Sequence, residues 1–260
     1  MLLNLWPAAW SRAQRSNATI IVAGCAMLVV LWAMAAVLSL VPGAIGENAQ
    51  QFAAGARTTL LLSLISGTVG VLLGVVAALG RTSKVFILRQ MAAFYIWIFR
   101  GTPLLVQILF VYFALPVLVP GLSLPDFACA VIALALNVGA YNAEAIRSGL
   151  LAVPRGQSEA ARALGLSRGY VFTDVVFPQA FKIALPPLVS NFVALLKDSS
   201  LAYAIGVVEL TNVGNRVQAA TFMPVETLAT TACIYLLLTT VMTQISNAVE
   251  HRFDVEGRQQ

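Results

Sequence analysis

The 260-residue sequence carries little charge, a single histidine and only three cysteines. Charged residues make up 10% of the chain and apolar residues 59%, whereas soluble domains average roughly 25% and 45–50%. This balance excludes a water-soluble enzyme and a disordered tail. A nucleic-acid module is excluded despite the net charge of +5, because the 16 basic residues are scattered between apolar runs. The chain is therefore expected to build its core against lipid.

Metal ligands are scarce. The three cysteines, Cys25, Cys129 and Cys233, lie far apart inside apolar runs, and we interpret them as small buried hydrophobic residues. With no Cys-x-x-Cys pair and His251 as the one histidine, the sequence predicts no zinc or redox site. It also has no Gly-x4-Gly-Lys-Ser/Thr phosphate loop, so a nucleotide would have to bind a partner.

Several apolar runs are long enough to cross a bilayer, which takes roughly 20 apolar residues in a helix. We expect an all-α, polytopic membrane protein with about six transmembrane helices. Their expected ranges are 19–41, 58–80, 91–115, 127–147, 183–208 and 227–249. The first is too long for a signal peptide and is interpreted as an uncleaved anchor. The expected organisation is an N-terminal tail with an additional helix (1–45), a transmembrane domain (46–252) and a C-terminal tail (253–260).

The basic residues are distributed asymmetrically between the loops. With the N-terminus inside, twelve Lys and Arg fall in inner segments and two, Arg57 and Arg216, in outer ones. Cytoplasmic loops carry the excess of Lys and Arg in membrane proteins. Both termini and the segment 149–182 are therefore expected in the cytoplasm.

Two features of the spans concern their packing. The second span carries small residues at four-residue steps (Ser66, Gly70, Gly74 and Ala78), which predicts close helix packing. The third span is broken by the run Arg100-Gly101-Thr102-Pro103. Transporters place binding sites at such breaks, because freed backbone groups at membrane depth must face protein or water.

The segment 149–182 is expected to form two short helices. Pro154 suits the first position of a helix and Gly165 a left-handed cap that ends it. Ser167 can cap a second helix, which we expect to stop where Pro178 interrupts it. The alanine-rich face of the first helix suits a groove on another protein, although a surface helix against its own bundle remains the alternative.

The spacing in this segment resembles the EAA loop of ATP-binding-cassette importer permeases. Glu159-Ala160-Ala161, Gly165 and Pro178 match the pattern E-A-A-x3-G-x9-I-x-L-P, with Val175 and Phe177 at its Ile and Leu positions. The segments 99–107, 136–144 and 195–201 resemble the polar amino acid (histidine, glutamine and glutamate type) subfamily. The resemblance implies a type I importer permease fold, MetI-like, with a cytoplasmic coupling helix.

The resemblance also implies partners and a location. A second permease subunit, identical or a sister chain, would complete the path across a bacterial inner membrane. A cytoplasmic ATPase dimer would hold ATP and Mg²⁺, and a solute-binding protein would deliver an amino acid from outside. This chain would be non-catalytic, bind no cofactor and no nucleic acid, and contact the ATPase through the coupling residues. These are Glu159, Ala160, Ala161, Gly165 and Pro178.

Polar side chains inside the spans are the candidates for the solute path, because ionisable residues there are costly and usually functional. Lys197 is suited to a substrate carboxylate and Asp198 to an ammonium, although a structural ion-pair network is the alternative. The ten candidates are Arg100, Thr102, Asn137, Tyr141, Glu144, Asn191, Lys197, Asp198, Ser199 and Ser200.

Two other functions fit the residues less well. A self-sufficient secondary transporter or channel would use Lys197 and Asp198 as its ion or substrate site. An intramembrane enzyme would need a Ser–Lys nucleophile pair, for which only Lys197 and Ser200 have usable spacing.

Overall fold

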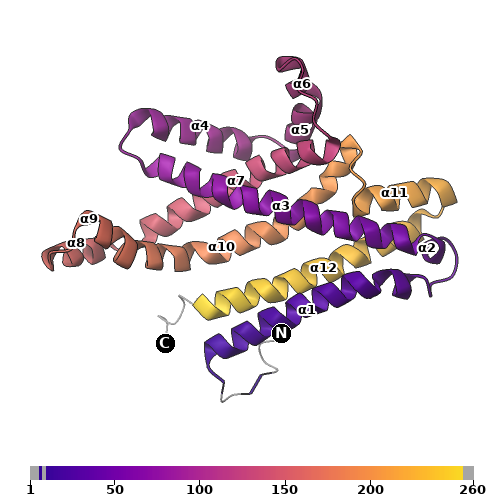
Figure 1. The fold of residues 1–260 in the computed structure, drawn as a ribbon, viewed down its shortest axis with the longest axis horizontal. Helices are drawn as coiled ribbons and strands as arrows, with labels where there is room; N and C mark the ends of the chain where they lie inside the picture. Colours follow the sequence, from indigo (N-terminus) through magenta and orange to yellow (C-terminus); the bar gives the residue numbers. More distant parts are fainter. Residues whose placement is uncertain (1–5, 8–9, 254–260) are drawn as a thin grey trace.

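The computed structural model describes residues 6–7 and 10–253, which are helical without a strand in that part of the chain (Figure 1). Five stretches are long and apolar enough to cross a membrane: α1 (Arg12–Leu38), α3 (Ala49–Thr82), α7 (Asp126–Ala152), the continuous stretch Arg168–Ile205, and α12 (Pro224–Phe253). A sixth comprises α4 (Phe86–Gly101) followed by α5 (Leu104–Leu109), η2 (Phe110–Ala114) and α6 (Leu115–Leu118). The expected all-α membrane fold is confirmed.

Shorter elements gather at the two ends of the bundle. They are α2 (Ala44–Glu47), α8 (Arg155–Ala163) and α11 (Leu210–Thr221). In Figure 1, α8 lies toward the same end as the C-terminus of α12, whereas α2 and α11 lie at the opposite end. The 149–182 segment and α11 thus lie at opposite ends of the bundle. Of the predicted C-terminal tail 253–260, all but Phe253 lies outside the described residues.

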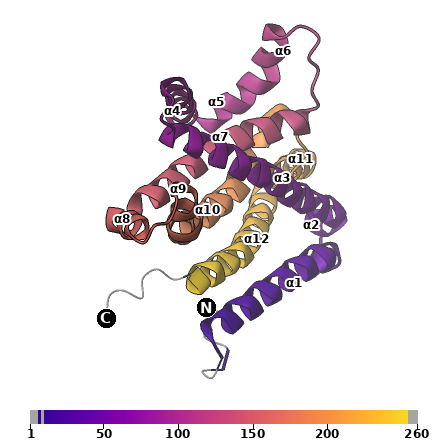
Figure 2. The same cartoon turned by 60° about the vertical axis from the view of Figure 1, so that its left-hand side comes forward.

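The third span is broken at the predicted run, and its halves extend beyond the expected 91–115, over Phe86–Gly101 and Leu104–Leu118. Its two halves meet at an angle of 110° after Gly101 (Figure 2). Thr102 has an extended backbone (φ −115°, ψ 148°), as expected for a residue before proline. Because Pro103 has no N–H to donate into the preceding helix, the chain turns here instead of continuing.

The expected interruption at Pro178 is wrong. The chain stays helical from α9 (Arg168–Tyr170) through η3 (Val171–Val176), α10 (Phe177–Asp198) and η4 (Ser199–Ile205). Pro178 lies in the first turn of α10, where a missing N–H is tolerated. The preceding turns of η3 are π-helical, and such wider turns shift the hydrogen-bond pattern by one residue ahead of the proline.

The small-residue stripe of α3 packs directly against α7, as predicted. A Cβ atom added to Gly74 would lie 2.7 Å from Cβ of Asn142, and one added to Gly70 would overlap Val138. The two backbones approach this closely only because the side chains are absent.

The prediction that all three cysteines are buried is wrong for two of them. Cys129 is buried in α7, but Cys25 in α1 and Cys233 in α12 are exposed. The apolar runs of outer helices face lipid as well as protein, so an apolar neighbourhood in the sequence does not imply burial.

The two outer helices, α1 and α12, lie side by side, and Arg252 Nη1 donates to Asn17 Oδ1 at 2.7 Å.

A buried carboxylate anchors α11 to α12. Glu209, with no exposed surface, caps α11 by accepting the backbone N–H groups of Thr211 and Asn212, each at 2.8 Å. It also accepts the hydroxyl of Tyr235 from α12 at 2.8 Å. Burial raises the pKa of Glu209, and the hydrogen bonds it accepts oppose that rise.

Candidate functional site

A cavity of about 410 Å³ opens where α5, α7, α10 and η4 meet. Five of the ten predicted solute-path residues line it, and they come from three separate spans. The lining residues are Thr102, Pro103, Leu104, Asn137, Val138, Tyr141, Asn191, Ala194, Leu195, Asp198 and Leu201. The cavity lies beside the 110° bend of the third span, where freed backbone groups need polar partners.

An amide network holds this bend. Gln107 Nε2 donates to the carbonyls of Phe99 and Thr102 at 3.0 and 3.1 Å, and to the Thr102 hydroxyl at 2.9 Å. Asn137 Nδ2 donates to the same Phe99 carbonyl at 3.1 Å and to Gln107 Oε1 at 3.0 Å. Asn137 thus joins α7 to the bend as well as lining the cavity. Gln107 was not among the predicted residues, because nothing nearby in the sequence marks it as the partner of a carbonyl eight positions away.

Asn191 and Asp198 line the same cavity, as their seven-residue spacing predicted. Asn191 Nδ2 donates to Oδ1 of the buried Asn142 at 3.0 Å, which ties α10 to α7. Asp198 ends α10, at the point where the chain tightens into η4.

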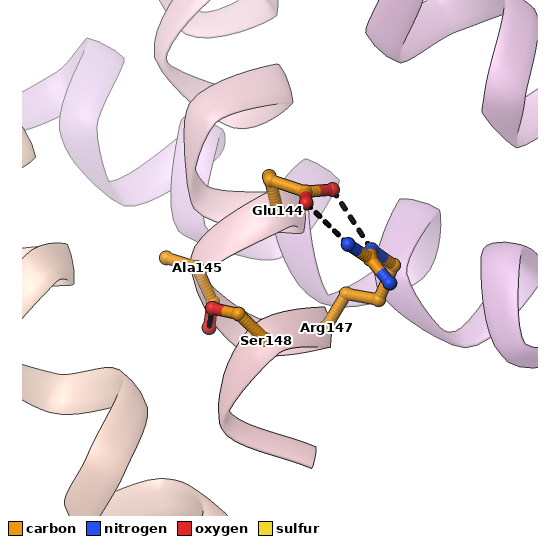
Figure 3. Close-up of polar contacts among 4 residues, drawn as sticks. All are labelled: Glu144, Ala145, Arg147 and Ser148. Carbon is orange, nitrogen blue, oxygen red and sulfur yellow. Dashed lines mark hydrogen bonds and ion pairs between the residues drawn. The ribbon is translucent and has the colours of Figure 1, made fainter. Parts of the chain in front are cut away.

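Arg100 and Glu144 border the cavity without lining it. The Arg100 guanidinium carbon lies 5.3 Å from the centre of the Tyr141 ring, a cation–π contact. Glu144 forms a two-point ion pair with Arg147, in which Arg147 Nε donates at 2.9 Å (Figure 3). Ser148 in the same figure donates to the Ala145 carbonyl at 2.9 Å. Glu144 is thus engaged by its own helix, on the turn that follows Tyr141.

The remaining predicted residues lie away from the cavity lining. Lys197 is exposed and is not among the lining residues. Ser199 is fully buried and donates to the Leu196 carbonyl at 2.8 Å, and Ser200 is half-buried. Within the described part of the chain, no group of three or more His, Cys, Asp or Glu side chains is arranged to hold a metal ion.

The predicted left-handed cap of the first loop helix is confirmed. Gly165 has φ +83°, and its N–H donates to the Arg162 carbonyl at 2.9 Å. The N–H of Leu166 donates to the Ala161 carbonyl at 3.2 Å, which completes a Schellman motif. Pro154 lies one position earlier than predicted, as the N-cap before Arg155.

One face of α8 is buried against the rest of the chain, and another face is exposed. Ala161 is buried, whereas Ala160 and Ala163 are exposed and Leu164 is 82% exposed. Glu159 is exposed and borders a cavity of about 360 Å³ together with Arg155, Ser158 and Arg162, among other residues. Pro178 lies in the first turn of α10, on the helical stretch that follows the loop.

Residues 70–255 match the family model described as binding-protein-dependent transport system inner membrane component. The chain belongs to this transport permease family. Among curated members, the glutamine transport system permease protein GlnP of Escherichia coli (strain K12) is 37% identical over 201 residues, covering 77% of this chain and 92% of GlnP. The arginine transport system permease protein ArtQ of Bacillus subtilis (strain 168) is 38% identical over 198 residues, covering 76% and 90%.

Solved structures agree with this assignment of the permease. An amino acid ABC transporter crystallised with histidines has a TM-score of 0.75 and 37% identity, covering 79% of this chain and 95% of that one. The methionine ABC transporter MetNI, at 20% identity and a TM-score of 0.60, shares the fold over 77% of this chain and 96% of its own. The resemblance to importer permeases and the MetI-like fold are thereby confirmed.

Proposed function

We propose that this chain is the translocating subunit of an ATP-driven importer for amino acids, and that the solute crosses through the cavity beside the third-span bend. The observation that carries this is the convergence of Asn137, Asn191 and Asp198 from two spans on one cavity. A polar solute must exchange its hydration for such groups to enter a hydrocarbon core. Relatives at 37–38% identity named for glutamine and arginine transport support the amino acid class.

In this proposal α8 is the coupling helix that docks into a groove on a cytoplasmic ATPase. The alanines Ala160 and Ala163 give a smooth exposed surface, and the neighbouring Leu164 supplies a large apolar side chain with no cover in this chain. The left-handed cap at Gly165 sets the direction in which the chain continues from α8 into α9. ATP and Mg²⁺ bind the ATPase, whose closure moves α8 and switches the cavity between the two sides of the membrane. This chain carries out no catalysis.

The remaining partners follow from the same role. A second permease subunit, a copy or a sister chain, completes the path in the inner membrane. An extracytoplasmic solute-binding protein delivers the amino acid to the end that carries α11. Both termini and α8 lie on the cytoplasmic side, in line with the excess of basic residues there.

Copurification tests this function. A tagged chain extracted gently from its native membrane should retain an ATPase that has a phosphate loop. Leu164→Ser should weaken that association by about 10- to 100-fold, since burying a leucine contributes about 1.5–3 kcal/mol. Val225→Ser is the matched control, because Val225 is 75% exposed at the start of α12, remote from α8. A chain that elutes without any ATPase, or equal loss from both variants, would count against the docking role of α8.

A further inference from the structure

Most of the polar atoms that remain free to contact a solute in this cavity are hydrogen-bond acceptors. Asn137 donates both N–H bonds of its amide away from the solute, one to the Phe99 carbonyl and one to Gln107 Oε1. Because a backbone carbonyl can only accept, the Phe99 contact fixes which end of the Asn137 amide is the nitrogen. Its Oδ1 is therefore the atom left to interact with a solute.

The two polar side chains that α10 contributes, Asn191 and Asp198, also offer mainly acceptors. Asn191 uses one N–H on Asn142 Oδ1, which leaves its own Oδ1 and a single N–H. Asp198 offers two carboxylate oxygens. The Thr102 hydroxyl donates its one hydrogen to the Ile98 carbonyl at 2.8 Å, so it too can only accept from a solute.

The charge of the lining residues also favours a cationic solute. Among the residues that line the cavity, Asp198 is the one charged side chain, and no Lys or Arg lines it. Lys197, its neighbour in the sequence, is not among the lining residues. Counted over the lining side chains alone, a bound zwitterion would leave a net negative charge, whereas a solute of net charge +1 would neutralise Asp198. Asp198 is exposed in this single chain, and the energy of pairing it with a cationic group grows as a bound solute displaces water from the cavity.

We propose that this cavity selects basic amino acids, with the guanidinium or ammonium of the substrate side chain held by Asp198, Asn137 and Asn191. The inference rests on the proposed function and names its substrate class. The substrate carboxylate then lies toward Tyr141, whose hydroxyl is the main donor left in the lining. Acidic amino acids are rejected, because their side chain would meet a carboxylate and oxygen acceptors.

The test is equilibrium binding to the purified complex in lipid nanodiscs. Radiolabelled arginine is displaced by unlabelled arginine, lysine, glutamine or glutamate. We expect lysine to compete within about tenfold of arginine, glutamine at least about tenfold more weakly, and glutamate not at all, given the strength of charge-assisted hydrogen bonds. Tighter binding of glutamine or glutamate than of arginine would overturn the proposal.

Variants separate this outcome from failure of the fold or of the function. Asp198→Asn should weaken arginine binding by about 10- to 100-fold and glutamine binding much less, so the arginine-to-glutamine ratio falls. Glu226→Gln removes an exposed carboxylate at the start of α12 and should leave the ratio unchanged. An equal loss for both solutes in Asp198→Asn refutes the charge selection. A complex that imports amino acids under ATP without preferring basic ones keeps the proposed function and refutes only the inference.

Discussion

Replacing Gln107 by leucine tests how the 110° bend of the third span is held. Leucine removes three contacts made by Gln107 Nε2 and the acceptor used by Asn137. The Phe99 carbonyl keeps a bond from Asn137 at 3.1 Å. The Thr102 carbonyl and one N–H of Asn137 lose their partners. Thr102 is exposed whereas Asn137 is buried, so one buried polar group is left unsatisfied.

The expected cost follows from the unsatisfied N–H of Asn137. An unsatisfied buried donor costs about 1–3 kcal/mol, so Gln107→Leu should lower the free energy of unfolding by about 1–3 kcal/mol. For a chain of this size about 1 kcal/mol corresponds to roughly 2–4 °C, which predicts a fall in Tm of about 2–12 °C. Fluorescence-monitored thermal unfolding of the purified complex measures it.

Gln51→Leu supplies the matched control for this measurement. Gln51 is exposed near the start of α3 and donates one bond, to Asn48 Oδ1 at 2.8 Å. Its substitution should change stability by no more than about 0.5 kcal/mol, or about 2 °C. If both variants unfold at the same temperature as the parent chain, Pro103 and apolar packing hold the bend, and the reasoning from the amide network is refuted.

Three further predictions concern single positions. Gly165→Ala places an L residue at φ +83° in open space, so it should cost about 1–2 kcal/mol of backbone strain and reduce ATP-driven uptake. Gly169→Ala, on the next helix with φ negative, should leave uptake intact, and equal uptake by the two variants would count against the cap. Gly74→Ala should lower Tm through overpacking worth about 1–3 kcal/mol, whereas Gly24→Ala, with nothing within 4 Å, should not; a harmless Gly74→Ala would contradict the close α3–α7 packing. Because burial raises the pKa of Glu209, the folded state binds its proton more tightly than the unfolded chain, so stability should fall as the pH rises through that pKa. Glu209→Gln should flatten this slope in pH-dependent unfolding, and an unchanged slope would assign it to other groups.

Local patterns in the sequence were sufficient for much of the fold. Long apolar runs located the spans, since crossing a bilayer imposes a length that few other structures need. Gly165 marked the end of α8, because few other residues adopt its left-handed conformation cheaply. Spacings of four and seven residues placed Asn137 with Tyr141, and Asn191 with Asp198, on shared faces of their helices, and all four line the cavity.

Properties that depend on contacts between distant segments were not predictable in this way. Gln107 and Glu209 matter through partners on other helices or across the bend, which no local spacing reveals. Adjacent residues on a helix point about 100° apart, so Lys197 and Asp198 lie in different surroundings despite their shared place in the chain. The helix persists through Pro178 because the turns of η3 before it are wider, a backbone property that the residue types alone do not specify.

ATP-driven uptake tests the central claim most directly. The copurified complex, with its ATPase and solute-binding protein, is reconstituted into liposomes and given radiolabelled arginine on the side of the binding protein. The account predicts accumulation that requires hydrolysable ATP on the α8 side and is lost in Asp198→Asn. Accumulation driven by an ion gradient in the absence of ATP would contradict it and assign transport to this chain alone.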